Sequence, residues 1–186
     1  MPSIEPVGSG EIRDPELQAL IERCARLGVP DPLFPRILAR VPDYAKALLR
    51  AMLLSHTEGD VDHKVKEIIR VQLARRAGDP YFARLRSAKA KDGGLDEAAI
   101  AAGCDDYERS PRFSEAEKWA LRYADQMYLN PASVDAAFYA GMKQHYSEAQ
   151  IMELGAFIAL HYGMQVFMRT LGNGTPKQES GIPRWE

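Results

Sequence analysis

Two short polar segments, each followed by a long run rich in apolar residues, constrain the fold of this chain most strongly. Ser114-Glu115-Ala116-Glu117 precedes WALRYADQMYL, and Ser147-Glu148-Ala149-Gln150 precedes IMELGAFIALHYGMQVFMRTLG. In both, a serine stands three residues before a glutamate or a glutamine, which is the capping-box pattern of a helix N-terminus. The sequence therefore predicts a helix after each segment. The second helix is apolar over most of its circumference, which indicates a central position or an oligomer interface.

Turn signals divide the rest of the chain into further helical segments. Asp-Pro pairs at 14–15 and 79–80 begin helices, because aspartate can cap a helix and proline fits its first position. Segment 61–78 carries apolar residues at helical spacing. We expect one continuous helix from the second Asp-Pro pair to Gly93-Gly94. No segment shows a convincing strand alternation, so the predicted fold class is all-α.

Composition limits the classes of protein that this chain can represent. Its 186 residues suggest one domain, and its formal net charge of −2 gives no global reason to expect a nucleic-acid or membrane partner. No uninterrupted apolar run approaches a bilayer span, and MPSIEPVGSGEIRD lacks the features of a secretory signal. The two cysteines, Cys24 and Cys104, form no C-x-x-C pair. We therefore expect a cytoplasmic protein, with Cys24 buried as a small apolar residue.

Three stretches of the sequence resemble a known family. They are PLFPRILARVPDYAKALLRAML, VKEIIRVQLARRAG with the following GGLDEAAI, and RFSEAEKWALRYADQMYLNPASVDAAFYAGMKQHYSEAQIMELGAFIALHYG. Their order is similar to that of the carboxymuconolactone decarboxylase superfamily, which includes the AhpD-type alkylhydroperoxidases. The resemblance implies an AhpD-like helical bundle over residues 33–172, assembled as a trimer or hexamer. Residues 1–32 would form an N-terminal helical extension and residues 173–186 a C-terminal tail.

The chain departs from the redox branch of that family. The branch has a glutamate, eleven intervening residues and then C-x-x-C-x-x-x-H; on this sequence the glutamate is Glu67, the cysteines are Asp79 and Phe82, and the histidine is Arg86. A peroxidase of this type needs one thiolate to attack the peroxide and a second thiol to resolve the sulfenate. We therefore reject a thiol peroxidase. The decarboxylase branch, which acts on a small anionic lactone without a cofactor, also has a histidine where Arg86 stands.

The resemblance suggests a set of site residues, each with a structural alternative. Glu67 would transfer a proton, or it pairs with Arg70 or His63 on its own helix. Asp79 is most simply a helix cap. Catalytic candidates are Glu67, Tyr81 and His161, with Tyr81 and His161 orienting the substrate or stabilising an enolate; substrate-binding candidates are Arg86, Phe82, Tyr162 and Gln165. The alternatives are packing for the rings of Tyr81 and Phe82, a solvated or Glu67-paired Arg86, and a hydrogen-bonded core position for His161.

Charge and histidine spacing bear on cofactors and partners. Residues 61–91 contain nine lysines or arginines and three acids, an excess that would attract an anionic small molecule. Nucleic-acid binding is the rival interpretation, but no nucleic-acid motif accompanies these residues. His63 and Glu67 form half of a metal site without an obvious third ligand, while His56 and His145 lie near predicted helix ends. We therefore predict no metal and no cofactor.

These observations favour a cofactor-free lyase or isomerase, of the decarboxylase type, acting on a small carboxylic acid or lactone. The alternative is a non-catalytic binding or assembly protein that keeps the helical scaffold. A buried Glu67–Arg86 ion pair with no cavity beside it would favour the scaffold, and an enclosed pocket exposing Glu67, with a free Tyr81 hydroxyl, would favour the enzyme.

Overall fold

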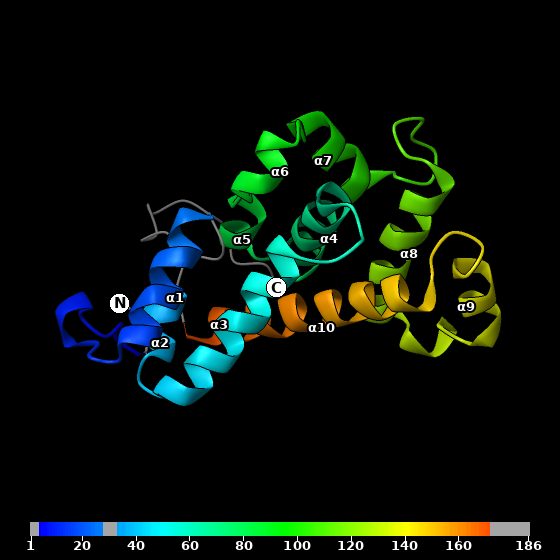
Figure 1. Ribbon diagram of the computed structural model, residues 1–186. Helices are drawn as coiled ribbons and strands as arrows, with labels where there is room; N and C mark the ends of the chain where they lie inside the picture. The colour runs from blue at the N-terminus through cyan, green and yellow to red at the C-terminus, as the bar shows by residue number, and fades with distance from the viewer. Residues whose placement is uncertain (1–3, 28–32, 172–186) are drawn as a thin grey trace.

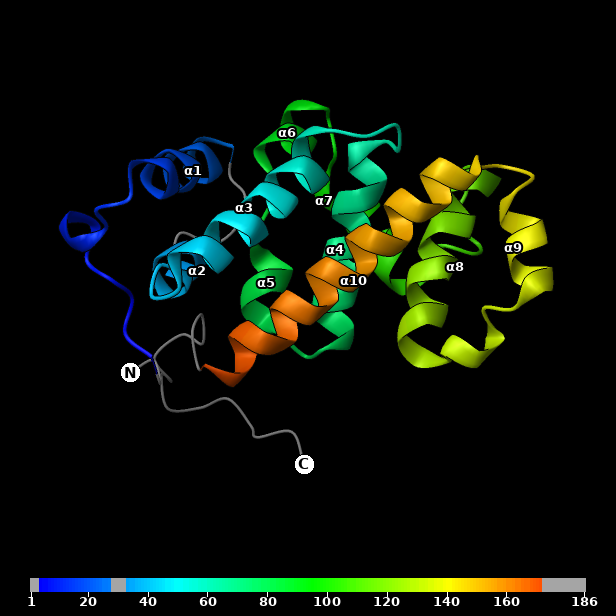
Figure 2. The same ribbon diagram turned by 60° about the horizontal axis from the view of Figure 1, so that its bottom comes forward.

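The computed structural model describes residues 4–27 and 33–171, and their regular secondary structure is entirely helical (Figures 1 and 2). This confirms the all-α prediction. In chain order the elements are η1 (Ser9–Glu11), α1 (Pro15–Arg26), α2 (Leu33–Leu38), α3 (Pro42–Thr57), α4 (His63–Arg76), α5 (Pro80–Arg84), α6 (Ala88–Asp92), α7 (Glu97–Asp105), α8 (Glu115–Leu129), η2 (Pro131–Ser133), α9 (Ala136–Met142) and α10 (Glu148–Thr170).

Both predicted capping boxes are present. The Ser114 side chain accepts from the backbone N–H of Glu117, whose carboxylate accepts from the backbone N–H of Ser114. Ser147 and Gln150 make the same reciprocal pair at the start of α10. Asp14 caps α1 through the N–H groups of the two residues after Pro15. Side-chain acceptors thus fix the beginnings of three helices at the positions that the sequence indicates.

The prediction of a single helix between residues 79 and 94 is wrong. α5 ends at Arg84, Leu85 is extended, and Ser87 caps a separate α6. The guanidinium of Arg70, on α4, donates hydrogen bonds to the backbone carbonyls of Phe82 and Leu85. In a continuous helix those carbonyls would accept from the backbone N–H groups of residues 86 and 89. A side chain from another helix therefore replaces the helical hydrogen bonds and stops α5.

Helix α4 occupies the centre of the molecule. Eleven of its 14 residues are buried, and it packs against α5, α6, α7, α8 and α10. α10 crosses α4, with α1–α3 on one side and α8 and α9 on the other (Figure 2). Apolar residues form two clusters, one built around Ile68, Leu121 and Leu154 and the other around Leu49 and Met168. α10 contributes to both clusters, so it holds the two halves of the bundle together.

By length and composition alone α10 is long and apolar enough to cross a membrane, the one such helix among residues 4–27 and 33–171. It meets this criterion although no uninterrupted apolar run in the sequence approaches the length of a bilayer span. Leu154, Phe157 and Met168 pack in the two clusters, which is the behaviour of a central helix in a globular bundle.

The N-terminal extension packs on the rest of the bundle. α1 lies against α3, and its residues Leu17 and Cys24 are buried in the cluster that contains Leu49. The burial predicted for Cys24 is confirmed. The C-terminal tail expected at 173–186 lies outside the described residues.

Close packing of α7 on α4 generates a test of this core. A Cβ atom at Gly103 would overlap Cγ2 of Ile68 and lie 3.3 Å from Cζ of Phe113. We expect Gly103→Ala to lower the free energy of unfolding by about 1–3 kcal/mol, because an overfilled core forces its neighbours to shift. Urea denaturation measures the loss. Gly163→Ala is the matched control, since apart from its chain neighbours and the backbone of its own helix no atom lies within 4 Å of its added Cβ, and it should gain about 0.5–1 kcal/mol. Equal effects of the two substitutions would contradict this packing.

Candidate functional site

Helices α3, α4 and α10 bring a group of buried polar side chains together between the two apolar clusters. Ionisable and amide side chains seldom become this buried without partners, so their arrangement identifies the part of the molecule most suited to a function. The group consists of His56, His63, Lys66, Glu67, Arg70, His161 and Gln165.

Glu67 and Arg70 form a buried ion pair at the middle of this group. Glu67 is 0% exposed and Arg70 is 6% exposed. Oε1 of Glu67 lies 2.7 Å from Nη2 of Arg70, and Oε2 lies 2.9 Å from Nε. Oε1 also accepts from the backbone N–H of Ser87 at 2.9 Å. The structure therefore shows the pairing with Arg70 that the sequence offered as the structural alternative for Glu67.

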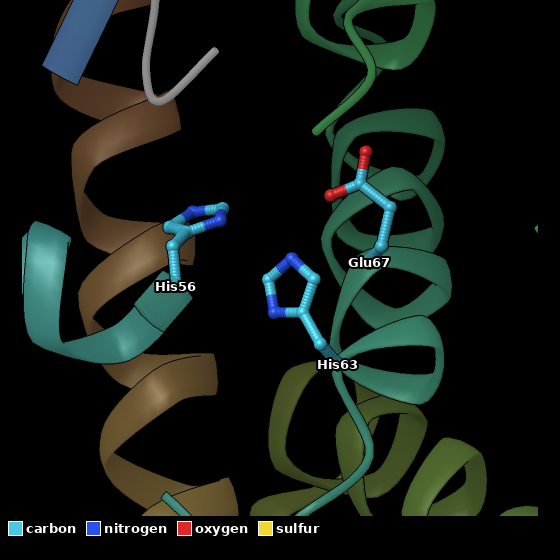
Figure 3. Close-up of side chains that lie close together, drawn as sticks. All are labelled: His56, His63 and Glu67. Carbon is cyan, nitrogen blue, oxygen red and sulfur yellow. The ribbon is translucent and has the colours of Figure 1, made fainter. Parts of the chain in front are cut away.

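Three histidines lie beside the ion pair. The ring of His56 is 5.3 Å from that of His63 and 4.8 Å from that of His161, measured between centroids. Nε2 of His63 is 2.8 Å from the hydroxyl of Ser87. The imidazoles of His56 and His63 approach each other from α3 and α4, and Glu67 stands one turn further along α4 (Figure 3). The rings thus bridge the gap between α3 and α4.

Burial keeps these imidazoles neutral. Desolvation lowers the pKa of His63 to about 4 and that of His161 to about 3, and it holds the pKa of His56 well below its ordinary value. The positive charge of Lys66 also lowers the pKa of all three histidines. The positive charge of Arg70 lowers the pKa of His56 and His161. A neutral imidazole offers one lone pair and one N–H, so each ring can either accept or donate on a given nitrogen.

A cavity of about 430 Å³ lies between α3 and α10. Its wall is almost wholly apolar, and Ser55, Glu58 and Glu153 are the lining residues that carry a hydroxyl or a carboxylate. Its lining residues are Ala51, Leu54, Ser55, Glu58, Gly59, Glu153, Ala156, Phe157 and Leu160. A volume of this size suits a small ligand.

Ser55 connects the cavity to the buried histidines. Its hydroxyl donates to the backbone carbonyl of Met52 at 2.7 Å and lies 3.1 Å from Nε2 of His161. Since the single hydroxyl proton points to the carbonyl, Nε2 of His161 carries the proton of the second hydrogen bond. A buried neutral imidazole therefore supports a hydroxyl that lines the cavity.

The two carboxylates of the cavity differ in their partners. Glu153 pairs with Nζ of Lys66 at 2.7 Å and accepts from the backbone N–H groups of Asp60 and Val61. Glu58 is exposed, and the contact that the structure gives its carboxylate is with the Thr57 hydroxyl at 3.4 Å. Glu153 is therefore fixed in place, while Glu58 is the carboxylate more available to a ligand.

Three of the residues proposed from the sequence meet at the polar group. Glu67 pairs with Arg70, Gln165 donates to the backbone carbonyl of Arg70 at 3.1 Å, and His161 lies against His56. None of the three lines the cavity.

The other four proposed residues lie elsewhere. Arg86 makes two hydrogen bonds of 2.7 Å with the carboxylate of Glu97. Phe82 is buried in the apolar cluster of Leu49, with Tyr81 packed edge-on against its ring. The ring of Tyr162 packs on that of Tyr128 at 4.7 Å. Arg86 and Phe82 also share no helix face, because α5 ends before Arg86.

The residues at the cysteine positions of the redox family carry structural roles here. Asp79 caps α5 through the backbone N–H groups of Tyr81 and Phe82, as the Asp-Pro pattern predicts.

The chain's own two cysteines, Cys24 and Cys104, are both free and buried, and desolvation raises the pKa of each thiol to about 11. Neither thiol has the low pKa that a nucleophilic cysteine needs.

Sequence reasoning missed Ser55, Glu58 and Ser87, and it assigned His56 to a helix end. His56 completes a set with His63 and Glu67 whose potential metal-ligating atoms all lie within 4.8 Å of one another. The turn between α3 and α4 folds His56 back onto His63, and residue spacing alone does not reveal that turn.

No protein-family model matches the chain. Over 108 residues it is 27% identical to the uncharacterized protein YnjA of Escherichia coli strain K12, and the match covers 58% of each chain.

Solved structures are similar over nearly the whole chain. The debrominase Bmp8, in a cysteine-to-alanine variant bound to 2,3,4-tribromopyrrole, has a TM-score of 0.75 at 20% identity, covering 91% of this chain and 89% of its own. A peroxidase-related protein of Ralstonia eutropha, described as an alkylhydroperoxidase AhpD core, has a TM-score of 0.77 at 16% identity, covering 96% and 93%. A peroxidase-related protein of Silicibacter has a TM-score of 0.71 at 17% identity, covering 87% and 86%. The chain therefore has the AhpD-like fold.

The buried neutral histidines generate a test of the polar group. In the unfolded chain each takes up a proton as the pH falls through about 6.5, whereas His63 and His161 remain neutral in the folded chain down to about pH 4 and about pH 3. The unfolded state binds more protons in this window, so the free energy of unfolding should fall as the pH falls from about 6.5 toward 4.

Urea denaturation at about pH 7, 6 and 5 measures this slope. His161→Gln should flatten it, and His145→Gln, at an exposed histidine, should leave it unchanged. A constant free energy of unfolding across these conditions would show that the histidines are not buried as neutral groups.

Proposed function

We propose that the protein is a cofactor-independent lyase or isomerase of cytoplasmic location, acting on a small carboxylic acid or lactone. The observation that carries this proposal is the hydrogen bond between Ser55, which lines the cavity, and the buried, neutral His161. A hydroxyl supported in this way can donate to a carbonyl oxygen and stabilise the negative charge that develops on it. Such stabilisation is the requirement shared by enolate-forming isomerases and decarboxylases.

The chemistry divides between two sides of the cavity. The Ser55 hydroxyl turns from the Met52 carbonyl to a substrate oxygen, while His161 continues to donate to Ser55. The Glu58 carboxylate accepts a proton from the carbon next to the substrate carbonyl, and an enolate forms. In an isomerase that proton returns to a second carbon. In a decarboxylase the bond from that carbon to a carboxylate group of the substrate breaks, carbon dioxide leaves, and the bonding electrons form the enolate, which then takes a proton from water.

The cavity wall favours a neutral substrate over an anionic one. Two acidic residues, Glu58 and Glu153, are among its lining residues, and no basic residue is among them in the described part of the chain. Arg86, which the sequence offered as an anion anchor, is paired with Glu97. Of the two substrate classes a neutral lactone therefore fits better, and for such a substrate the reaction is an isomerisation, because it carries no carboxylate to lose. Glu67, which does not line the cavity, supports the site by holding Arg70 and Ser87.

The alternative function is a non-catalytic binding or assembly protein. Large apolar side chains are exposed on the two helices that border the cavity: Leu54 at 59%, Met152 at 71% and Phe167 at 41%. Exposed apolar residues of this kind are typical of a surface that another chain covers. We propose that this surface joins copies of the chain, in the trimer or hexamer that the family resemblance implies.

Turnover of a panel of small lactones and carboxylic acids, followed by NMR, tests the enzyme. Ser55→Ala should lower kcat by about 10²–10³-fold with little change in KM, because the oxyanion donor acts in the transition state. Ser133→Ala, at a serine outside the cavity lining, should retain full activity. Undiminished turnover by Ser55→Ala would contradict the role assigned to the Ser55 hydroxyl. Ligand binding without any turnover, in a wild-type protein that sediments as an oligomer, would favour the assembly protein.

A further inference from the structure

We propose that His56, His63 and Glu67 bind a single zinc ion that joins α3 to α4. Their potential ligand atoms lie within 4.8 Å of one another, and the two imidazoles face each other across the space between the helices (Figure 3). All three residues are buried, at 3%, 7% and 0% exposed. The proposal is independent of the reaction in the cavity, because none of the three residues lines it.

Two unpartnered nitrogen atoms point to a missing ligand. Nδ1 of His56 and Nδ1 of His63 are buried, and neither has a hydrogen-bond partner. Buried polar atoms are nearly always paired, because leaving one unpaired costs about 1–3 kcal/mol. A ligand that bound either nitrogen would use its lone pair and remove that cost.

The surroundings of His63 resemble those of a metal-bound histidine. Its Nε2 lies 2.8 Å from the Ser87 hydroxyl, and this hydrogen bond sets which ring nitrogen carries the proton. Ligating histidines usually donate their second ring N–H to an acceptor, and this hydrogen bond fixes the tautomer and the ring orientation. Ser87 is itself held by the hydrogen bond from its backbone N–H to Glu67. One short segment therefore orients two of the three proposed ligands.

The donor set selects the metal. Two imidazole nitrogens and one carboxylate oxygen are zinc ligands, and hard cations such as Mg²⁺ prefer oxygen alone. Ligand atoms about 2.0–2.1 Å from a tetrahedral zinc ion lie roughly 3.4 Å apart, so binding must draw the three side chains together. Glu67 shares its carboxylate with Arg70, but a carboxylate has about four lone-pair positions and the described contacts occupy three of them. A buried position away from the cavity assigns the ion a structural role.

Cobalt provides the direct probe, since it takes zinc sites and absorbs visible light there. The full chain, treated with chelator and desalted, is titrated with Co²⁺ and then with Zn²⁺. We expect saturable visible absorption at one cobalt per chain, lost when zinc displaces it. Absence of saturable absorption would overturn the proposal.

Variants identify the ligands. His63→Gln should weaken cobalt binding by at least about 10–100-fold, the loss that follows from removing an outer-shell partner alone, whereas His145→Gln, at an exposed histidine outside the cluster, should bind as wild type does. Equal affinity in His63→Gln and wild type would contradict the site. If His63→Gln does not fold, as judged by circular dichroism, X-ray absorption spectroscopy of the wild-type zinc complex identifies the ligands instead. Two imidazoles with oxygen ligands support the site, and a sulfur ligand or a shell of water alone overturns it.

Discussion

The Glu67–Arg70 ion pair is the interaction on which the arrangement of the site depends. Placing two charges in a protein interior is costly unless hydrogen bonds satisfy both, and here they do. Arg70 donates to both oxygens of Glu67 and to the carbonyls of Phe82 and Leu85. These bonds stop α5 and turn the chain at residues 85–87. The turn places Ser87 where its backbone N–H reaches Glu67 and its hydroxyl reaches His63.

The same polar group separates the two apolar clusters and connects them to the cavity. Along α10 the buried residues change from Phe157 in one cluster, through His161 and Gln165, to Met168 in the other. The ring of His161 faces the buried interior, and its Nε2 faces the Ser55 hydroxyl. A low-dielectric interior strengthens such hydrogen bonds and penalises any that are lost. The hydroxyl in the cavity is therefore fixed by groups that have little freedom to move.

Much of the fold could be predicted from local patterns, but only part of the site could. The capping serines and Asp79 act within three residues of their own position, so sequence spacing locates them. Glu67 and Arg70 have the spacing of an ordinary surface pair; only packing by helices distant in the sequence buries them. Arg86 was expected to hold a ligand, but Glu97 reaches it from α7. Ser55 and His56 gain their roles from contacts with α10 and α4, which residue spacing does not show.

A double-mutant cycle on Glu67 and Arg70 tests the central role of the ion pair most directly. The free energy of unfolding is measured for wild type, Glu67→Gln, Arg70→Gln and the double variant, with Arg86 and Glu97 as a control pair. Each single change at the buried pair should cost about 3–5 kcal/mol, because it leaves a buried charge uncompensated, and the coupling should be about 2 kcal/mol or more. The control pair includes a mostly exposed glutamate and should couple by less than about 1 kcal/mol. Additive losses at Glu67 and Arg70, with no coupling between them, would contradict the role assigned to this pair.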